Sequence, residues 1–146
     1  MSESRIIQSL FAALLSAVIG GIIWAAVALL TGYEVSLLAW AIGGMAGYSV
    51  VFASKGHITL VHQAIAIIAS LIGIVLGKYF HFGYWTADGI DGIFNSYIFS
   101  EFTSDFIEFF SLYDIIFVLL AVVTAWQIPE KHTIVDDPFI EHDEAN

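Results

Sequence analysis

Three ionisable side chains fall at one level of this chain, each at the edge of a segment that is otherwise apolar. Glu34 begins the second apolar segment, Lys78 ends the third and Asp114 begins the fourth. Ionisable groups at membrane depth are costly and need partners, so the three could form a charged gate or an ion-binding vestibule. We favour the structural alternative, a salt bridge from Lys78 to Glu34 or Asp114. Each of the three has a neighbouring tyrosine, as in an interfacial aromatic belt: Tyr33, Tyr79 and Tyr113.

A single histidine, His62, lies one turn inside the third apolar segment. Such a residue could relay protons or bind a metal. It is five residues from His57, whereas zinc-binding pairs on one helix face are spaced by four, so the two predict no metal site. We expect His62 to be hydrogen-bonded to water, to lipid headgroups or to a hydroxyl such as that of Ser16 or Ser49.

Other patterns that could do chemistry are weak or missing from this sequence. The segment 88–92, DGIDG, lacks the alternating ligands of an EF-hand loop and is typical of a pair of turns. The chain has no cysteine, no phosphate-binding glycine loop, no nucleophile motif, no HExxH pair and no basic patch for nucleic acid. We therefore expect a protein that is not an enzyme and that takes no cofactor, metal or nucleic acid.

Composition shows which elements must position these residues. The chain is 59% hydrophobic and only 12% charged, far from the balance of a soluble globular domain. A membrane-spanning helix needs about 20 apolar residues. The sequence thus predicts an all-α membrane domain over residues 1–128, a bundle of four spanning helices at 6–30, 35–53, 58–78 and 112–128, with Pro129 ending the last one.

Two further segments lie outside these spans. Aromatic residues recur at helical spacing over 101–111 with acidic residues between them, which predicts an amphipathic helix in the outer membrane interface. Residues 129–146 are acidic with few apolar side chains, which predicts a disordered tail. Arg5, Lys55 and Lys131 fall on one side of the four spans, so the positive-inside rule places both termini in the cytoplasm.

Small residues four apart form a ladder on each of the first three spans. Such ladders let helix backbones approach closely in a bilayer. Equal helical rise on either side of each turn predicts that Gly43 faces Ala69, Ala39 faces Gly73 and Gly21 faces Gly44. The large residues Trp24, Trp40, Leu71 and Ile74 are expected to turn elsewhere. The predicted packing set is Gly21, Ala39, Gly43, Gly44, Gly47, Ala69, Gly73 and Gly77.

Several short motifs resemble a group of small bacterial four-helix inner-membrane proteins without an assigned activity, some of which carry an N-terminal zinc ribbon. The motifs cover residues 20–24, 31–34, 40–44, 54–56 and 113–126. The resemblance implies the four-helix architecture and a bacterial inner membrane. The chain has no cysteine, so a role that depends on the zinc ribbon does not carry over.

For function, the sequence predicts a non-enzymatic membrane protein that acts through helix packing. It would be an accessory or scaffold component of a larger complex, or a homo-oligomer, with the lipid bilayer as its constant partner. The alternative is a small ion channel or transporter gated by Glu34, Lys78 and Asp114. Almost no polar side chain falls at the middle of a predicted span, which disfavours a pore within one subunit.

Overall fold

In the computed structural model, which describes residues 2–32 and 36–131, every regular element is a helix. Four of the helices are long and apolar enough to cross a membrane, namely α1, α2, α3 and α5. This confirms the all-α class and the four membrane-length segments. The elements in chain order are α1 Ser2–Thr31, α2 Leu37–Ser54, α3 Leu60–Ala87, η1 Ile90–Phe94, α4 Ser96–Ser104, η2 Phe106–Phe109 and α5 Leu112–Lys131.

Helices α3 and α5 run further than the sequence predicts. No proline or cap interrupts α3 after Lys78, so it continues to Asp88, whose left-handed backbone (φ 52°) ends it. At 28 residues α3 is about 42 Å long, which exceeds a hydrocarbon core of about 30 Å. Helix α5 passes through the buried Pro129 and ends at Lys131, so the predicted stop at Pro129 is wrong. The part of the predicted tail after Lys131 lies outside the described residues.

The segment before α5 is broken into two short helices rather than one helix over 101–111. Helix α4 starts earlier, because the Asn95 side chain accepts hydrogen bonds from the backbone N–H groups of Tyr97 and Ile98. At Asp105 the backbone leaves the helical region (φ −111°, ψ 29°), and the short η2 follows. The ring of Phe102 in α4 contacts Tyr79 and Phe82 of α3 and Phe106 and Phe109 of η2, with ring centroids 4.9–6.1 Å apart. Through these contacts the two pieces fold back on α3.

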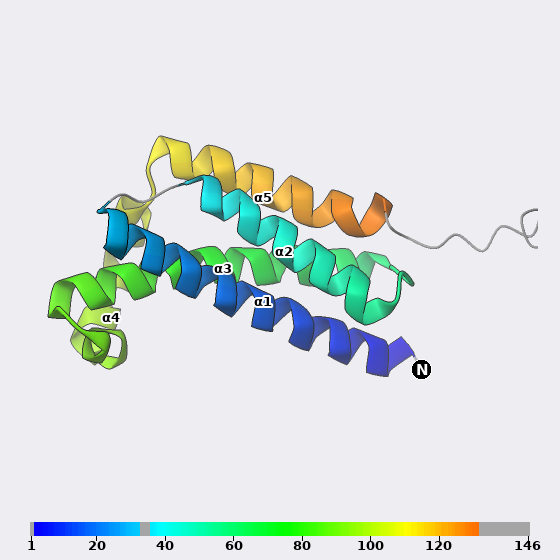
Figure 1. Ribbon diagram of the computed structural model, residues 1–146, viewed down its shortest axis with the longest axis horizontal. Helices are drawn as coiled ribbons and strands as arrows, with labels where there is room; N and C mark the ends of the chain where they lie inside the picture. The colour runs from blue at the N-terminus through cyan, green and yellow to red at the C-terminus, as the bar shows by residue number, and fades with distance from the viewer. Residues whose placement is uncertain (1, 33–35, 132–146) are drawn as a thin grey trace, which may run out of the picture.

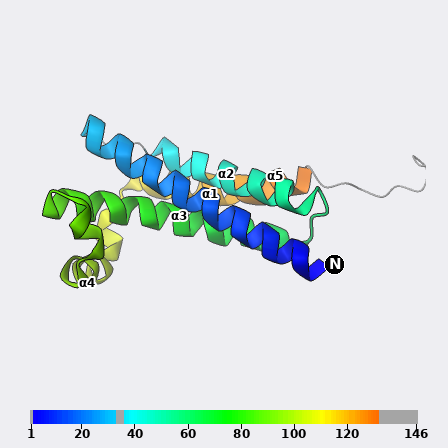
Figure 2. The same ribbon diagram turned by 60° about the horizontal axis from the view of Figure 1, so that its bottom comes forward.

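The four long helices lie side by side, as Figures 1 and 2 show. Helix α1 packs against α2 and α3, while α5 packs against α2 and α3. Helices α2 and α3 are thus the two that touch every other long helix. The end of the molecule beyond Lys78 is covered by η1, α4 and η2, which fold against the outer part of α3.

One close backbone approach joins α1 to α3, which run in the same direction. A Cβ atom added to Gly21 would lie 2.9 Å from the carbonyl oxygen of Gly73 and 3.1 Å from the amide nitrogen of Gly77. A Cβ atom added to Gly73 would lie 2.8 Å from the carbonyl oxygen of Ala17. Only glycine fits both positions without a shift, so these residues let the two helices touch along the backbone.

Gly43 and Gly47 of α2 face α5, whereas the alanines Ala39 and Ala46 of the same helix lie in core clusters with residues of α3. A Cβ atom on Gly43 would lie 2.5 Å from the carbonyl oxygen of Ala121, and one on Gly47 would lie 3.1 Å from Ile128. The predicted pairs of Gly43 with Ala69 and Gly21 with Gly44 are therefore wrong about the partner helix. The predicted pairs assume that helices adjacent in sequence pack closest. In the structure these tight contacts instead join parallel helices that are not adjacent in sequence, α1 with α3 and α2 with α5.

Two large side chains that were expected to turn away lie in the core. Trp24 and Ile74 are at most 1% exposed and pack in one cluster with Ala28, Ala39 and Ile42. Small residues of the same cluster, Ala28 and Ala39, leave room for the indole ring of Trp24. Trp40 and Leu71, by contrast, are 45% and 37% exposed.

Adjacent glycines of α2 provide a matched test of this packing. Gly43→Ala places a methyl group against the α5 backbone, so we expect a loss of about 1–3 kcal/mol, the usual cost of overpacking a core. At Gly44 the nearest atom to an added Cβ is Ile128 Cδ1 at 4.0 Å, so Gly44→Ala should be neutral. Thermal unfolding in detergent followed by circular dichroism measures both. Equal unfolding temperatures for the two variants would contradict the α2–α5 contact.

Candidate functional site

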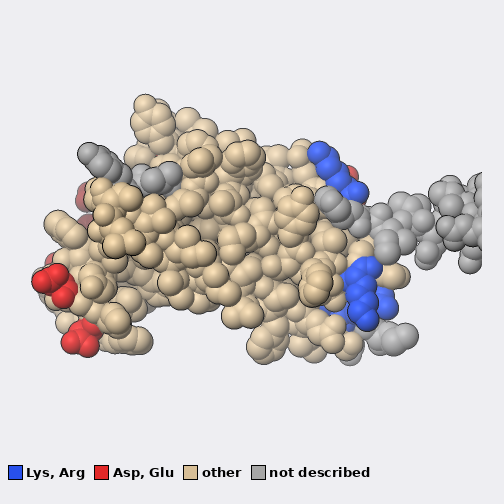
Figure 3. Space-filling view, in the orientation of Figure 1, with Lys and Arg blue, Asp and Glu red and all other residues tan. Residues whose placement is uncertain are grey.

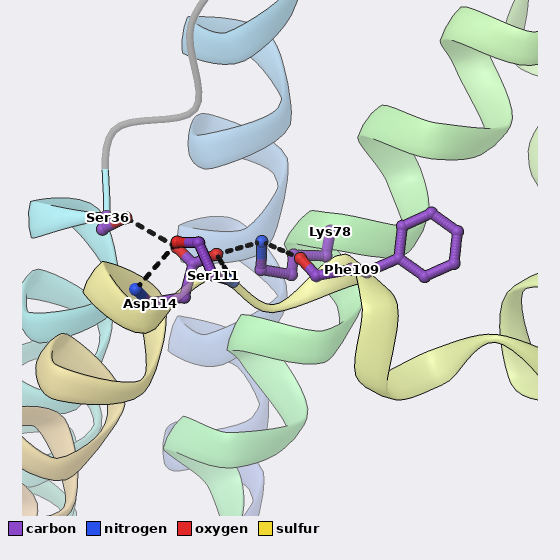
Figure 4. Close-up of polar contacts among 5 residues, drawn as sticks. All are labelled: Ser36, Lys78, Phe109, Ser111 and Asp114. Atoms are coloured by element: carbon purple, nitrogen blue, oxygen red, sulfur yellow. Dashed lines mark hydrogen bonds and ion pairs between the residues drawn. The ribbon is translucent and has the colours of Figure 1, made fainter.

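A buried ion pair between α3 and α5 is the most polar feature of the described interior. Lys78 and Asp114 are 1% and 2% exposed, and Lys78 Nζ lies 2.8 Å from Asp114 Oδ2 (Figure 4). Lys78 lies one helical turn after the buried Ile74 on α3, so it belongs to the face of that helix that packs into the core. A buried charge is stable only when it is paired and hydrogen-bonded, which makes the other partners of both groups decisive.

Asp114 receives hydrogen bonds from two further parts of the chain besides Lys78. The Ser36 hydroxyl, just before α2, donates to Oδ1 at 2.6 Å, and the Ser111 backbone N–H donates to Oδ2 at 2.9 Å. The Asp114 N–H donates in return to Ser111 Oγ at 3.2 Å. This reciprocal arrangement is a capping box, which satisfies free N–H groups at the start of α5.

Lys78 is surrounded by acceptors and aromatic rings. Its Nζ donates to the carbonyl oxygen of Phe109 at 2.7 Å as well as to Asp114. The ammonium also lies 5.5 Å from the centre of the Trp24 ring and 5.0 Å from that of Phe110, within range of cation–π attraction. The indole of α1 thus contributes to holding a charge that belongs to α3.

Together these contacts join all four long helices at one point. Trp24 comes from α1, Ser36 leads into α2, Lys78 belongs to α3 and Asp114 to α5, as the close-up in Figure 4 shows for the last three. Both carboxylate oxygens already accept hydrogen bonds. A group with this arrangement is suited to holding helices together rather than to exchanging ions.

The other residues of the predicted outer level are placed differently. Glu34 and its neighbour Tyr33 lie outside the described residues, so only Lys78 and Asp114 are seen together. Tyr113 is 71% exposed. Tyr79 turns inward instead, donates a hydrogen bond to the carbonyl oxygen of Ile93 and contacts the ring of Phe102.

His62 has a local partner. Its Nδ1 accepts a hydrogen bond from the backbone N–H of Thr59 at 3.1 Å and lies 2.9 Å from Thr59 Oγ1, as part of a capping box at the start of α3. The expected partners Ser16 and Ser49 instead donate to carbonyl oxygens of their own helices. His62 is 3% exposed, and its Nε2 has no hydrogen-bond partner among the described residues.

The described residues offer no cluster that could hold a metal ion. No group of three or more histidines, cysteines or acids gathers anywhere in residues 2–32 and 36–131. Segment 88–92 forms the left-handed cap of α3 and the first turn of η1. Gly92 lies so close to Gly83 that a Cβ atom there would overlap the Gly83 carbonyl, so this segment serves to fold η1 back onto α3.

Sequence reasoning missed three residues of the site, two of which carry a usable signal. Ser111 and Asp114 form the pattern S-x-x-D before an apolar run, which is typical of a capping box. Ser36 directly precedes α2, a position at which serine is favoured. Trp24 has no such signal, because its place beside Lys78 depends on how α1 is rotated against α3.

Charge is divided between the two ends of the molecule. Arg5, Lys55 and Lys131 lie at the end that holds the N-terminus, together with the acid Glu130, and most of the described acidic side chains lie at the other end (Figure 3). At that acidic end a hydrogen bond with Glu101 and the negative charge of its carboxylate raise the pKa of Tyr97 above its ordinary value. Among the described residues, the only lysine or arginine on this side is the buried Lys78.

Comparison with known proteins adds no functional evidence. No family model, curated protein or solved structure matches the chain. The function proposed below therefore rests on the ion pair, the helix contacts and the exposed surface.

We predict that neutralising Asp114 lowers stability. Removing one partner of a buried ion pair costs about 3–5 kcal/mol, because the other charge is left unpaired. Asp114→Asn should therefore lower the unfolding temperature in detergent far more than Asp105→Asn, which changes an exposed acid at the same end.

The double variant Lys78→Met with Asp114→Asn tests the reason for this loss. It removes both charges and should be more stable than Asp114→Asn alone. If the double variant is the less stable of the two, the unpaired lysine is not the cause.

Proposed function

We propose that the chain is an integral membrane protein whose four long helices cross the bilayer as a bundle, with α4 and η2 at the outer interface. Large apolar side chains around the long helices support this arrangement. Phe11 is 74% exposed, Leu15 63% and Leu119 62%, all within helices of membrane length. Exposing so continuous an apolar surface to water is unfavourable, whereas lipid chains in a bilayer would cover it.

The distribution of lysine and arginine supports an orientation with the N- and C-termini in the cytoplasm. Arg5, Lys55 and Lys131 lie at the end shared by the N-terminus and the end of α5 (Figures 1 and 3). Positive residues near the ends of spans favour the cytoplasmic side. The resemblance noted in the sequence supports a bacterial inner membrane.

Within that membrane we propose a non-enzymatic role as an accessory or scaffold component that acts through helix packing. The observation that carries this proposal is the buried, hydrogen-bonded Lys78–Asp114 pair, which contacts α1 through Trp24 and the start of α2 through Ser36. Elsewhere the described interior offers no continuous polar path, and Ser70 near the middle of α3 donates to its own helix. The buried polar side chains of the described residues are Ser9, Ser54, His62, Gln63, Ser70, Lys78 and Asp114.

The small-residue ladders favour a scaffold over an oligomer built on those ladders. Gly21 is used against Gly73 and Gly77, and Gly43 is used against Ala121, all within one chain. No comparable stripe of the predicted set is left facing outward, apart from the half-buried Gly44. Partners would therefore meet the outer faces of the helices or the acidic end.

Flux measurements separate this role from the alternative of a channel or transporter. In liposomes, the wild-type protein and the Asp114→Asn variant should both leak ions no faster than empty vesicles, because both oxygens of the carboxylate already accept hydrogen bonds from the protein. Subunit number is measured on the same samples by light scattering. Robust flux that is lost in Asp114→Asn but kept in Asp105→Asn would overturn the scaffold proposal.

The orientation can be tested with single cysteines, because the chain has none of its own. Ser104→Cys places a thiol on the exposed outer end, and Glu130→Cys places one on the exposed end of α5. In intact cells a membrane-impermeant maleimide should label the first variant and not the second, and both should react after the cells are opened. Labelling of Glu130→Cys alone in intact cells would reverse the orientation.

A further inference from the structure

An apolar groove lies at the outer end of the molecule, between α1 and α3. The two helices diverge there, as Figure 2 shows, and η1 closes the far side. The groove has a volume of about 380 Å³, within the usual range of about 300–1,000 Å³ for small-molecule sites. Its walls include Ile22 and Ala26 on α1, Phe80 and Tyr84 on α3, and Ile90 and Phe94 on η1.

The groove is open toward the surroundings of the bundle. Ile22 on α1 is 53% exposed, Ile90 64% and Phe94 83%. The polar atom that the lining offers is the Tyr84 hydroxyl, and the remaining side chains are hydrocarbon. Apart from that hydroxyl, a wall of this kind favours apolar chains and offers water no hydrogen-bond partner.

Its depth matches the outer boundary of the hydrocarbon core. About 20 helical residues cross that core, which places the boundary near residue 80 on α3 when the count starts at Leu60. Phe80 is then at the boundary, and Tyr84 lies about 6 Å above it. The groove therefore runs from the acyl chains to the level of the headgroups.

Two exposed acids are close in sequence to the residues that line the headgroup end of the groove. Asp88 ends α3 and Asp91 lies in η1 between the lining residues Ile90 and Ile93, and both are exposed. The described residues offer no exposed lysine or arginine at this end, since Lys78 is buried and the other three cations lie at the opposite end. The local field thus attracts a cation and repels a phosphate or glycerol headgroup that carries net negative charge.

We propose that this groove binds one phospholipid whose headgroup ends in a primary ammonium. An acyl chain occupies the apolar groove, and the ammonium pairs with Asp88 and Asp91. This inference rests on the proposed membrane insertion. A second copy of the chain fits less well, because a two-fold contact here would bring the acidic ends of both copies together.

Native mass spectrometry of the full chain measures this preference. The protein in mild detergent is mixed with equal amounts of phosphatidylethanolamine and phosphatidylglycerol that carry the same acyl chains. Exposed ion pairs are weak, so we expect a preference of about two- to fivefold for phosphatidylethanolamine. Asp88→Asn with Asp91→Asn should bring the ratio to one, and asparagine also tolerates the left-handed backbone of position 88.

Matched variants test the two parts of the site separately. Asp105→Asn with Glu108→Asn removes the same charge from exposed positions away from the groove and should keep the preference. Ala26→Trp fills the groove and should abolish retained lipid, whereas Ala41→Trp, on the separate apolar surface between α2 and α5, should not.

Three results would overturn the lipid site. They are equal retention of both lipids by the wild type, a preference unchanged in the Asp88 and Asp91 variant, and a lipid-free dimer that Ala26→Trp disrupts. Alkaline carbonate extraction of membranes tests the prior proposal independently. Release of the chain into the soluble fraction would refute membrane insertion itself, whereas a retained chain without lipid preference refutes only the lipid site.

Discussion

The fold depends on a charge that has no access to water. Lys78 is carried on α3, one of the two helices that touch every other long helix, and its ammonium is balanced by Asp114, by a backbone carbonyl and by two aromatic rings. A buried ammonium is stable only while these partners remain in place. The pair therefore sets the rotation of α3 and α5 against each other, and Trp24 and Ser36 bring α1 and α2 into the same arrangement.

Close helix contact complements this polar junction. Gly21 and Gly73 bring α1 and α3 into backbone contact below Lys78, and Gly43 brings α2 against α5. In a bilayer the hydrophobic effect does not draw helices together, so such van der Waals contacts and buried polar bonds must hold them. Small residues inside and large apolar residues outside follow from that constraint. Beyond these contacts α1 and α3 diverge, and the space between their outer ends forms the groove.

Much of the site was within reach of sequence reasoning. The membrane level shared by Lys78 and Asp114 follows from their places at the edges of two apolar runs, and S-x-x-D marks Ser111 as a cap. The role of Trp24 was not predictable, since an indole in an apolar run gives no sign of which neighbour it faces. The extent of α3 was missed because hydropathy reports where a helix is apolar, whereas its end is decided by the left-handed residue at Asp88.

The sequence by itself determined the all-α class, the four membrane-length helices and the small-residue ladders, because each depends on composition and on periodicity along one helix. Only the tertiary structure decided that Gly21 meets Gly73, that Gly43 meets Ala121 and that Asp114 pairs with Lys78. The physical reason is that a ladder marks one face of a helix and leaves its partner open. Lateral order and rotation are set when all four helices pack at once around one buried charge.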